Sequence, residues 1–383
     1  MSVVIVGAGQ AGFQTALSLR SAGYAEPVTI VGDEPHLPYQ RPPLSKGFLL
    51  GKQAIESAVL RPESFYAAQR IEVLAGDRAV AIDRVSRRVI LSSGAHCDYQ
   101  KLVLATGASV RRLPHQGIVY LRTREDAIEL KQRIENAGTI AVVGGGFIGL
   151  EVAAAARALD REVRVYEMQN RLMPRSVSPV VSEFFREVHA SHGVEICLSA
   201  PALAPQADLI VAGIGVVPNV ELAREAGLPV GNGIVVDEHL RTADENIFAV
   251  GDCAEHPNPF AGARTRLESV QNAVDQAKVA AANIAGRSEA YRAVPWFWTD
   301  QFDVKLQMAG LSGGADDEAV RGDPQARKFS VFYFRNGRLI AVDSINRAGE
   351  HLIARKLLAA GARLAPEQAA DESFDLKALT AQE

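Results

Sequence analysis

The chain has 383 residues, of which 48% are hydrophobic and 22% are charged, and 32 are glycines. This composition is typical of a globular α/β protein and excludes a disordered, collagenous or coiled-coil chain. Lys and Arg (41) nearly balance Asp and Glu (45), and the formal charge of −4 gives no overall basic field that would favour nucleic acid as a partner.

Three cysteines, Cys97, Cys197 and Cys253, lie too far apart to form a CxxC pair or a zinc-binding pattern. They suit a reducing compartment, and we expect buried small side chains at these positions and no metal site. No apolar run approaches the ~18 residues of a membrane-spanning helix, and the first predicted strand leaves no room for a signal peptide. The sequence therefore predicts a cytoplasmic protein without a membrane partner.

The first predicted strand, Val3–Val6, leads directly into the sequence GAGQAG at residues 7–12, which we call the first fingerprint. In a dinucleotide-binding turn of this spacing, Gly7 permits the tight turn and Gly9 lets the backbone approach a pyrophosphate. Gly12 lets the next helix pack closely on the strand. The N-terminal N–H groups of that helix would face the negative charge of the pyrophosphate.

A second apolar strand, Val28–Val31, is followed by Asp33. This is the place, about 20 residues beyond the turn, where a carboxylate can accept a ribose hydroxyl. A lone GxGxxG pattern is weak because other glycine-rich turns also match it. Here strand, turn, helix, second strand and acid all occur in order, and the sequence therefore predicts a dinucleotide site.

The whole unit recurs later in the chain. Thr139–Val143 is a predicted strand, residues 144–149 (GGGFIG) form the turn, and Leu150–Leu159 is an alanine-rich helix. The next strand, Val163–Tyr166, ends at Glu167. We call residues 144–149 the second fingerprint, and its pattern glycines are Gly144, Gly146 and Gly149. The repetition predicts two dinucleotide sites in one chain.

Glu167 bears on which nicotinamide coenzyme is used. A carboxylate at this position can accept both hydroxyls of the adenosine ribose but would repel a 2′-phosphate. We therefore expect NADH to be preferred over NADPH. Arg164 and Arg171 lie close in sequence and could soften that preference.

Two more strands flank the second fingerprint in the sequence. Lys101–Gly107 ends in Ala-Thr-Gly, and Ile247–Asp252 ends in Gly-Asp; a helix is predicted from Ser269 to Ala285. This order resembles the flavoproteins of the glutathione reductase type, in which an NAD domain is inserted into an FAD domain. The resemblance implies FAD at the first fingerprint and NADH at the second. It adds three residues to the FAD site: Thr106, Gly107 and Asp252.

The C-terminal part begins with an aromatic cluster, Pro295–Asp300, that holds both tryptophans of the chain. Core packing and a place beside a bound flavin are both open for this cluster. Phe329–Phe334 and Leu339–Ser344 alternate around Asn336-Gly337 and predict a hairpin. Helical segments follow, and Pro366 is expected to break them.

Seven motifs occur in the order found in the ferredoxin reductases that serve bacterial cytochromes P450 and Rieske dioxygenases, and the resemblance covers nearly the whole chain. They are HLPYQRPPLSK, YLRT, GGGFIGLEVA, GIGVVPN, VGDCA, ESVQNA and PWFWTDQ. In that family FAD is contacted at positions that match Ala11, Asp33, Arg41, Lys46, Ala79, Arg122, Asp252 and Val270. Two stretches depart from the family pattern, because the chain is short after Arg112 and again after Cys197, where relatives carry further strands.

The resemblance also implies roles for residues near the flavin. Lys46 and Glu151 match the lysine and glutamate that pair near flavin N5, where a lysine stabilises negative charge on the reduced flavin and the glutamate keeps it charged. Trp298 matches an aromatic residue on the exposed side of the flavin. In the related disulfide reductases, the stretch that corresponds to residues 41–46 (RPPLSK) carries two cysteines. Since this chain has none there, no internal dithiol can accept the electrons.

A basic segment, residues 327–363, carries eight Lys or Arg against only Asp343 and Glu350. Solvated sheet and helix faces would explain it as well as a docking surface would. Small ferredoxins are typically acidic, and a basic patch would speed their association in a salt-dependent way. The eight residues are Arg327, Lys328, Arg335, Arg338, Arg347, Arg355, Lys356 and Arg363.

These observations predict an α/β fold with two Rossmann-like domains of the glutathione reductase type and a C-terminal α+β domain. The expected boundaries are 1–111 and 238–295 for the FAD domain, 112–237 for the NAD domain and 296–383 for the last domain. We expect an FAD enzyme that takes hydride from NADH and reduces a [2Fe-2S] ferredoxin of a P450 or Rieske system, as a monomer or weak homodimer. The alternatives are a reductase of rubredoxin or a small oxidant, and a redox-responsive binding protein like apoptosis-inducing factor.

Overall fold

The computed structural model describes residues 2–201 and 206–380. The chain divides into two compact units, each made of three segments. The first unit contains Met1–Gln40, Glu56–Ser109 and Val217–Ala293, and the second contains Arg41–Ile55, Val110–Val216 and Val294–Glu383. The short strands β8 (Ala108–Val110) and β14 (Val216–Pro218) span two of the points where the chain passes from one unit to the other.

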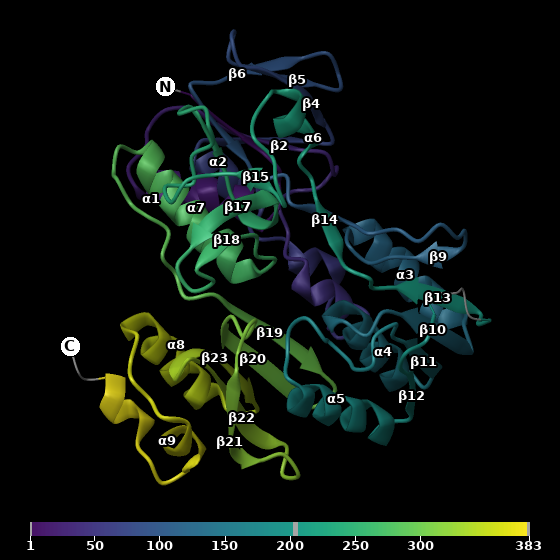
Figure 1. Ribbon diagram of the computed structural model, residues 1–383. Helices are drawn as coiled ribbons and strands as arrows, with labels where there is room; N and C mark the ends of the chain where they lie inside the picture. Colours follow the sequence, from purple (N-terminus) through teal and green to yellow (C-terminus); the bar gives the residue numbers. More distant parts are fainter. Residues whose placement is uncertain (1, 202–205, 381–383) are drawn as a thin grey trace. The chain divides into compact units, whose positions relative to one another are not determined.

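The first unit is built on a five-stranded parallel sheet in the order β16-β7-β1-β2-β3, of which Figure 1 labels β2. The central strand β1 pairs in register with β2 on one side and β7 on the other. The strands are β1 (Val3–Val6), β2 (Val28–Gly32), β3 (Ile71–Ala75), β7 (Lys101–Leu104) and β16 (Ile247–Ala249). Helices α1 (Gln10–Ser21) and α7 (Val270–Ile284) pack against each other beside this sheet.

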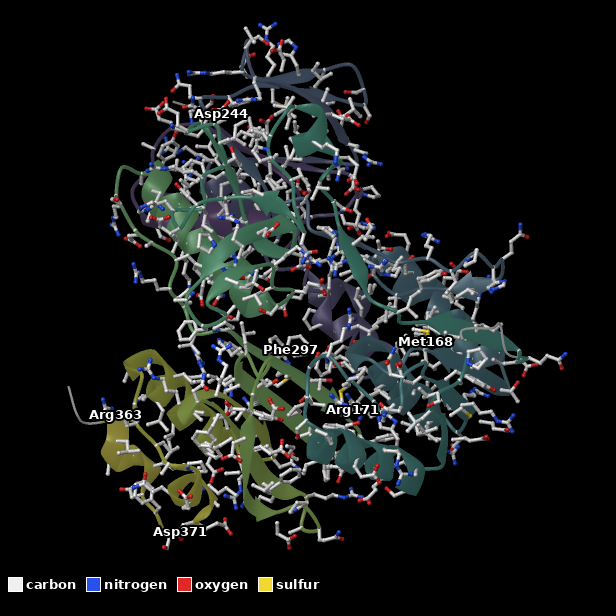
Figure 2. The ribbon with its side chains drawn as sticks, viewed as in Figure 1. Met168, Arg171, Asp244, Phe297, Arg363 and Asp371 are labelled. Atoms are coloured by element: carbon white, nitrogen blue, oxygen red, sulfur yellow. The ribbon has the colours of Figure 1, made fainter. Side chains whose placement is uncertain are left out.

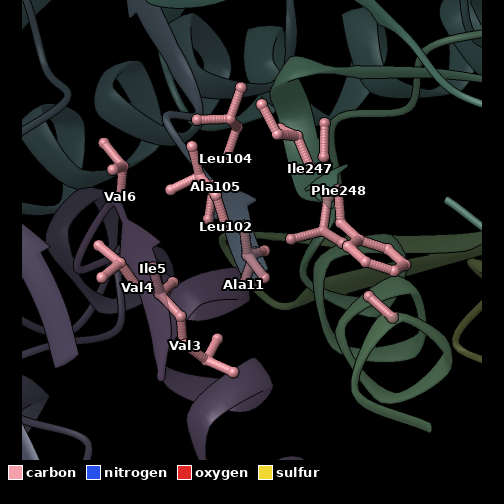
Figure 3. Packing of buried hydrophobic residues seen from close by; sticks show 14 of the residues in the cluster. Val3, Val4, Ile5, Val6, Ala11, Leu102, Leu104, Ala105, Ile247 and Phe248 are labelled. Atoms are coloured by element: carbon pink, nitrogen blue, oxygen red, sulfur yellow. The ribbon is translucent and has the colours of Figure 1, made fainter. Parts of the chain in front are cut away.

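The sheet residues of this unit form a continuous apolar core (Figure 3). Ile5, Leu102 and Leu104 are fully buried between the sheet and its covering elements, and Phe248 packs beside them from β16. Burial of each such side chain stabilises the fold by about 1.5–3 kcal/mol. Strands buried on both faces need apolar residues at every position, which is why Val3–Val6 shows no polar alternation.

Smaller elements complete the first unit. A three-stranded antiparallel sheet contains β4 (Ala79–Asp83), β5 (Arg88–Leu91) and β6 (His96–Asp98). A second small sheet contains β15 (Ile234–Val235), β17 (Ala254–Asn258) and β18 (Ala263–Thr265). The short helices are α2 (Glu63–Ala68), α6 (Glu221–Glu225) and the 3-10 turn η3 (Gly251–Cys253); a further 3-10 turn, η2 (Ile55–Ala58), lies where the chain enters this unit.

The second unit contains another parallel sheet, in the order β12-β11-β10-β13-β9. Its strands are β9 (Ile118–Val119), β10 (Thr139–Val143), β11 (Glu162–Tyr166), β12 (Val194–Cys197) and β13 (Leu209–Ala212). Its helices are α3 (Arg124–Asn136), α4 (Phe147–Ala158) and α5 (Pro179–Ser191). The shortened stretch after Cys197 lies partly outside the described residues, which omit 202–205.

The same unit holds a five-stranded antiparallel sheet, in the order β19-β20-β23-β22-β21. Its strands are β19 (Trp296–Gln301), β20 (Val304–Gly310), β21 (Asp317–Asp323), β22 (Lys328–Arg335) and β23 (Arg338–Ile345). The predicted hairpin is confirmed, since Asn336 and Gly337 both have positive φ between β22 and β23. Helix α8 (Ala348–Ala360) packs on β20 and β23.

The prediction that Pro366 breaks a helix is wrong. Helix α8 ends at Gly361, which has the left-handed conformation of a C-terminal cap, and Pro366 is the first residue of α9 (Pro366–Ala370). Beyond α9 the chain is held by Arg321, whose buried guanidinium donates to the carbonyl oxygens of Ala369, Asp371, Glu372 and Phe374.

The cysteines differ in burial. Cys253 is buried, as predicted, whereas Cys97 and Cys197 are only half-buried, and all three are free thiols. Among the described residues, no helix combines the length and the apolar character needed to cross a membrane. The three-domain boundaries inferred from the sequence stay a prediction.

Candidate active site

The first fingerprint has the geometry of a pyrophosphate-binding turn. Gly7 has φ +119°, and a Cβ added there would lie 2.1 Å from the carbonyl oxygen of Ala105. A Cβ at Gly12 would lie 1.9 Å from the carbonyl oxygen of Gly7, so only glycine fits at either position. A Cβ at Gly9, by contrast, would meet no described atom within 4 Å. Two glycines are thus required for packing, and the third leaves an open approach to the backbone.

Helix α1 begins at this open glycine, and within the described residues its N-terminus has no side-chain cap. Helices α3 and α5 differ, because Thr123 and Ser178 cap them with their hydroxyls. Uncapped N–H groups at the start of a helix form a ready site for a phosphate. The residues present therefore fit the diphosphate of a dinucleotide.

Other predicted FAD residues of the first unit surround the carboxyl ends of its strands. Thr106 donates its hydroxyl to the carbonyl of Asn219 (2.6 Å), and the amide of Asn219 donates back to the Thr106 carbonyl (2.8 Å). Gly251 donates its N–H to the Gln276 side chain (2.7 Å), which fixes the turn that carries Asp252. A Cβ added at Gly251 would lie 3.0 Å from that of Ala11.

Three further residues of this set lie at element ends. Asp33 is exposed just after β2, where a carboxylate can reach a ribose. Ala79 is buried at the start of β4. Val270 is the first residue of α7, whose N-terminus is capped by the Ser269 hydroxyl accepting from Asn272 (3.0 Å).

The second fingerprint repeats the geometry of the first. A Cβ at Gly144 would lie 2.5 Å from the carbonyl oxygen of Gly213, and one at Gly149 would lie 2.1 Å from that of Gly144. At Gly146 the nearest described atom would be at an ordinary contact distance of 3.8 Å. Gly146 also begins α4 without a side-chain cap within the described chain. The residues of the second fingerprint therefore also fit the diphosphate of a dinucleotide.

Glu167 follows β11 and is almost fully buried. Its two carboxylate oxygens accept the N–H groups of Gly145 (2.7 Å) and Gln169 (2.8 Å). Each carboxylate oxygen has a further lone pair, so Glu167 can still accept ribose hydroxyls. The Glu167 carboxylate is thereby held beside the glycine turn of the second fingerprint.

The two arginines that could soften a preference for NADH are both engaged elsewhere. Arg171, which is labelled in Figure 2, donates to the carbonyls of Val177 (2.6 Å) and Pro174 (2.7 Å) in its own loop. Arg164 pairs with Glu195 at 2.7 Å, and this charge raises the pKa of its guanidinium.

The proline-bearing segment of residues 41–46 forms the 3-10 turn η1 (Pro42–Ser45). Arg41 donates to the carbonyl of Arg122 (2.5 Å), just ahead of the Thr123 capping box that starts α3. The structure therefore brings together Arg41 and Arg122, two residues predicted to contact FAD.

Lys46 and Glu151 form an ion pair with Nζ and Oε1 at 2.8 Å. The Glu151 side chain is 2% exposed and that of Lys46 is 22% exposed. Ser45 donates its hydroxyl to Oε2 of the same carboxylate, and Thr299 on β19 donates to Oε1 at 2.6 Å. Glu151 is thus a buried carboxylate that receives one ammonium and two hydroxyl donors.

The aromatic cluster forms the first half of β19. Phe297, which is labelled in Figure 2, packs against Phe147, the first residue of α4, with ring centroids 4.7 Å apart. Trp296 and Trp298 lie 5.6 Å apart, and the Arg355 guanidinium lies 4.9 Å over the Trp296 ring. All three aromatic side chains are only partly buried, which leaves them able to contact a ligand or partner.

Two of the eight cationic residues of the basic segment form ion pairs with carboxylates, which reduces the unpaired positive charge that the segment carries. Arg327 pairs with Asp303 (3.1 Å), and Arg347 pairs with Glu350 and Glu372. Asp343, one of its two acids, is buried, and burial raises its pKa to about 7. Its exposed cations are Lys328, Arg338, Lys356 and Arg363.

Sequence reasoning missed Ser45, Thr299 and Asn219. Ser45 directly precedes Lys46, and Asn219 closes the GIGVVPN motif, so each carried a local signal. Thr299 lies within the PWFWTDQ motif, but nothing in that motif points to Glu151, which is 148 residues away in the sequence.

Comparison with known proteins places this geometry in a family. Residues 1–277 match the family described as pyridine nucleotide-disulphide oxidoreductase, and residues 296–380 match the reductase C-terminal family. Rhodocoxin reductase of Rhodococcus erythropolis is 49% identical over 98% of this chain and 94% of its own length.

Two solved structures are also similar to the chain. The ferredoxin reductase for the CYP199A2 system of Rhodopseudomonas palustris has a TM-score of 0.96 at 44% identity, over 99% of this chain and all of the other. The reductase in the covalent putidaredoxin reductase–putidaredoxin complex has a TM-score of 0.96 at 39% identity, over all of this chain and 99% of that one.

These matches confirm the predicted fold class, two Rossmann-like domains of the glutathione reductase type followed by a C-terminal α+β domain. They also confirm the resemblance on which the site residues were chosen. The chain belongs to the pyridine nucleotide-disulphide oxidoreductase family.

Proposed function

We propose that this protein is an NADH:ferredoxin oxidoreductase that uses FAD and supplies single electrons to a [2Fe-2S] ferredoxin of a P450 or Rieske oxygenase system. The carrying observation is the ion pair between Lys46 and the buried Glu151, in which Lys46 comes from a segment, residues 41–46, that has no cysteines. When bound, the flavin supplies the step from two-electron hydride chemistry to one-electron transfer. With no dithiol in residues 41–46, the electrons must pass to an external acceptor.

The chain's own residues bind the two dinucleotides and hold a charge in place. The first fingerprint takes FAD, with Asp33 at the ribose and Asp252 at the ribitol. Glu151 orients the Lys46 ammonium, so that it stabilises negative charge on the reduced flavin.

The second fingerprint takes NADH. Glu167 would accept ribose hydroxyls and repel a 2′-phosphate, and its burial beside the Gly145 N–H supports that role. Arg164 and Arg171 are held by other partners, which supports the preference for NADH over NADPH. A ratio of NADPH to NADH efficiency above one would contradict it.

We place the ferredoxin contact at Trp298 and the exposed cations Lys328, Arg338, Lys356 and Arg363. Their support is the partly buried aromatic surface on β19 and a local positive charge that suits an acidic partner. The protein would act in the cytoplasm, where free thiols stay reduced, as a monomer or weak homodimer.

The test is reduction of an acidic [2Fe-2S] ferredoxin, a rubredoxin and cytochrome c by NADH, each as a function of salt. We expect ferredoxin to be reduced fastest, at a rate that falls steeply with ionic strength. Faster reduction of rubredoxin would favour that alternative. A long-lived complex of reduced flavin with nicotinamide, with slow transfer to all three acceptors, would favour a redox-responsive binding protein.

A further inference from the structure

A chain of buried polar side chains leads away from Glu151 within the second unit. Thr299 donates its hydroxyl to Oε1 of Glu151 (2.6 Å), and the Gln301 amide donates Nε2–H to the Thr299 oxygen (3.3 Å). The Gln301 carbonyl oxygen then lies 2.9 Å from Nε2 of His189 on α5. Thr299, Gln301 and His189 are each 0% exposed.

In this series of hydrogen bonds, each side chain donates to the next one toward Glu151. A hydroxyl has one proton, so Thr299 can donate to Glu151 only if its other hydrogen-bond partner is a donor. Gln301 meets that condition, because it presents N–H to Thr299 rather than its carbonyl oxygen. His189 in turn fixes the orientation of the Gln301 amide by donating Nε2–H to that carbonyl oxygen.

The surroundings of His189 suit a neutral ring with its proton on Nε2. Its Nδ1 is buried without a hydrogen-bond partner among the described residues, so a proton there would be unsatisfied. Phe302 packs edge-on against the ring, with centroids 5.1 Å apart. Burial lowers the pKa of His189 to about 4.

We propose that Thr299, Gln301 and His189 are positioning residues that orient the Glu151 carboxylate toward Lys46. This inference rests on the proposed function, in which the Lys46–Glu151 pair stabilises the reduced flavin. The residues hold no substrate themselves. They fix which protons Glu151 receives, and thereby where the Lys46 ammonium lies.

The first experiment measures flavin reduction by NADH in Thr299→Val, Gln301→Met and His189→Phe proteins. Each lost hydrogen bond matters less with distance from Glu151, so we expect slowing of roughly tenfold, threefold and twofold in that order. Thr299→Ser keeps the hydroxyl and should restore the rate to within about twofold. Rates in the three variants equal to that of the parent enzyme, or a Thr299→Ser enzyme as slow as Thr299→Val, would overturn the proposal.

A double-mutant cycle separates positioning from a general loss of structure. If Thr299 acts through Lys46, Thr299→Val should slow a Lys46→Gln enzyme by less than about twofold. An effect as large as in the parent enzyme would overturn this inference alone. If Lys46→Gln leaves both the rate and the flavin potential unchanged, the proposed role of the pair fails instead.

A spectroscopic readout tests the chain in the unmutated protein. Nitrogen NMR of histidine-labelled holoenzyme should show His189 neutral at pH 7 with its proton on Nε2. The signal is assigned by its loss in His189→Phe, with His192→Gln, at the C-cap of the same helix, as the control. His192 is not one of these hydrogen-bonded residues, and 34% of its side chain is exposed. Its replacement should therefore leave the rate unchanged. A proton on Nδ1, or a charged ring, would reverse the hydrogen bonds and overturn the proposal.

Discussion

The two fingerprints have nearly identical glycines and different neighbours. In both, the first and third pattern glycines leave no space for a methyl group and the middle one is open. The residue two places beyond the last glycine differs. In the first it is Gln14, a half-buried side chain that donates to Ser18 of its own helix (3.0 Å). In the second it is Glu151, the buried centre of a polar cluster.

The acids after the second strands differ as well. Asp33 is exposed, whereas Glu167 is buried and holds the N–H of its own glycine turn. The same local fold thus serves two purposes. Both fingerprints fit a dinucleotide, and the helix that follows the second also carries Glu151, the carboxylate that contacts Lys46.

The largest expected effect is a loss of stability when the third glycine of either fingerprint is replaced. Comparing the two replacements tests whether the two glycine turns are equally constrained by packing. Gly12→Ala and Gly149→Ala each place a Cβ about as close to a carbonyl oxygen, at 1.9 Å and 2.1 Å. We expect both to destabilise the protein by more than ~4 kcal/mol and to leave little soluble protein. Thermal unfolding by circular dichroism measures this, with Gly9→Ala as the control that should fold. A stable Gly149→Ala protein would show that the second turn is looser than its twin.

The next effect concerns which fingerprint holds the flavin. Asp252 lies in the first unit, and loss of a charge-assisted hydrogen bond of ~1.5–3 kcal/mol should weaken FAD binding roughly ten- to a hundredfold. Fluorescence titration of the apoprotein of Asp252→Ala with FAD measures it. Gly146→Ala, in the second fingerprint, should leave that affinity unchanged. Full flavin occupancy in Asp252→Ala would contradict the assignment.

Exchanging the differing residues tests the comparison directly. Glu151→Gln removes the charge that orients Lys46 and should slow flavin reduction by NADH roughly tenfold or more. Gln14→Glu, the mirror substitution on α1, should change the rate by less than about twofold, because Gln14 donates to Ser18 of its own helix. Stopped-flow absorbance of the flavin gives both rates. A slow Gln14→Glu enzyme would mean that the first fingerprint also takes part in the reaction.

The smallest effect separates the two acids. Glu167→Gln should weaken NADH binding about tenfold, since a charged acceptor is lost beside the Gly145 N–H, and should reduce the discrimination against NADPH. Asp33→Asn should leave NADH affinity unchanged and affect FAD instead. Titration with each coenzyme measures the constants, and a loss of NADH affinity in Asp33→Asn would reverse the assignment.

Much of the fold could be predicted because its rules are local. Val3–Val6 and the hairpin at Asn336-Gly337 are encoded by short patterns and occur where they were expected. The cluster around Glu151 could be predicted only in part. Lys46 is 105 residues from Glu151 and was paired with it through a family pattern. The motif that contains Thr299 and Gln301 does not indicate their partners, because Thr299 contacts Glu151 over 148 residues and Gln301 contacts His189 over 112.

Arg321 shows a different relation between sequence and structure. Its guanidinium holds residues 369–374 through their carbonyl oxygens, which every amino acid has. The side chains of the segment add separate contacts, because Glu372 pairs with Arg347 and both Ala369 and Phe374 pack in an apolar cluster. Replacement of Arg321 would release four carbonyl oxygens at once, whereas a substitution within the segment removes one side-chain contact at a time.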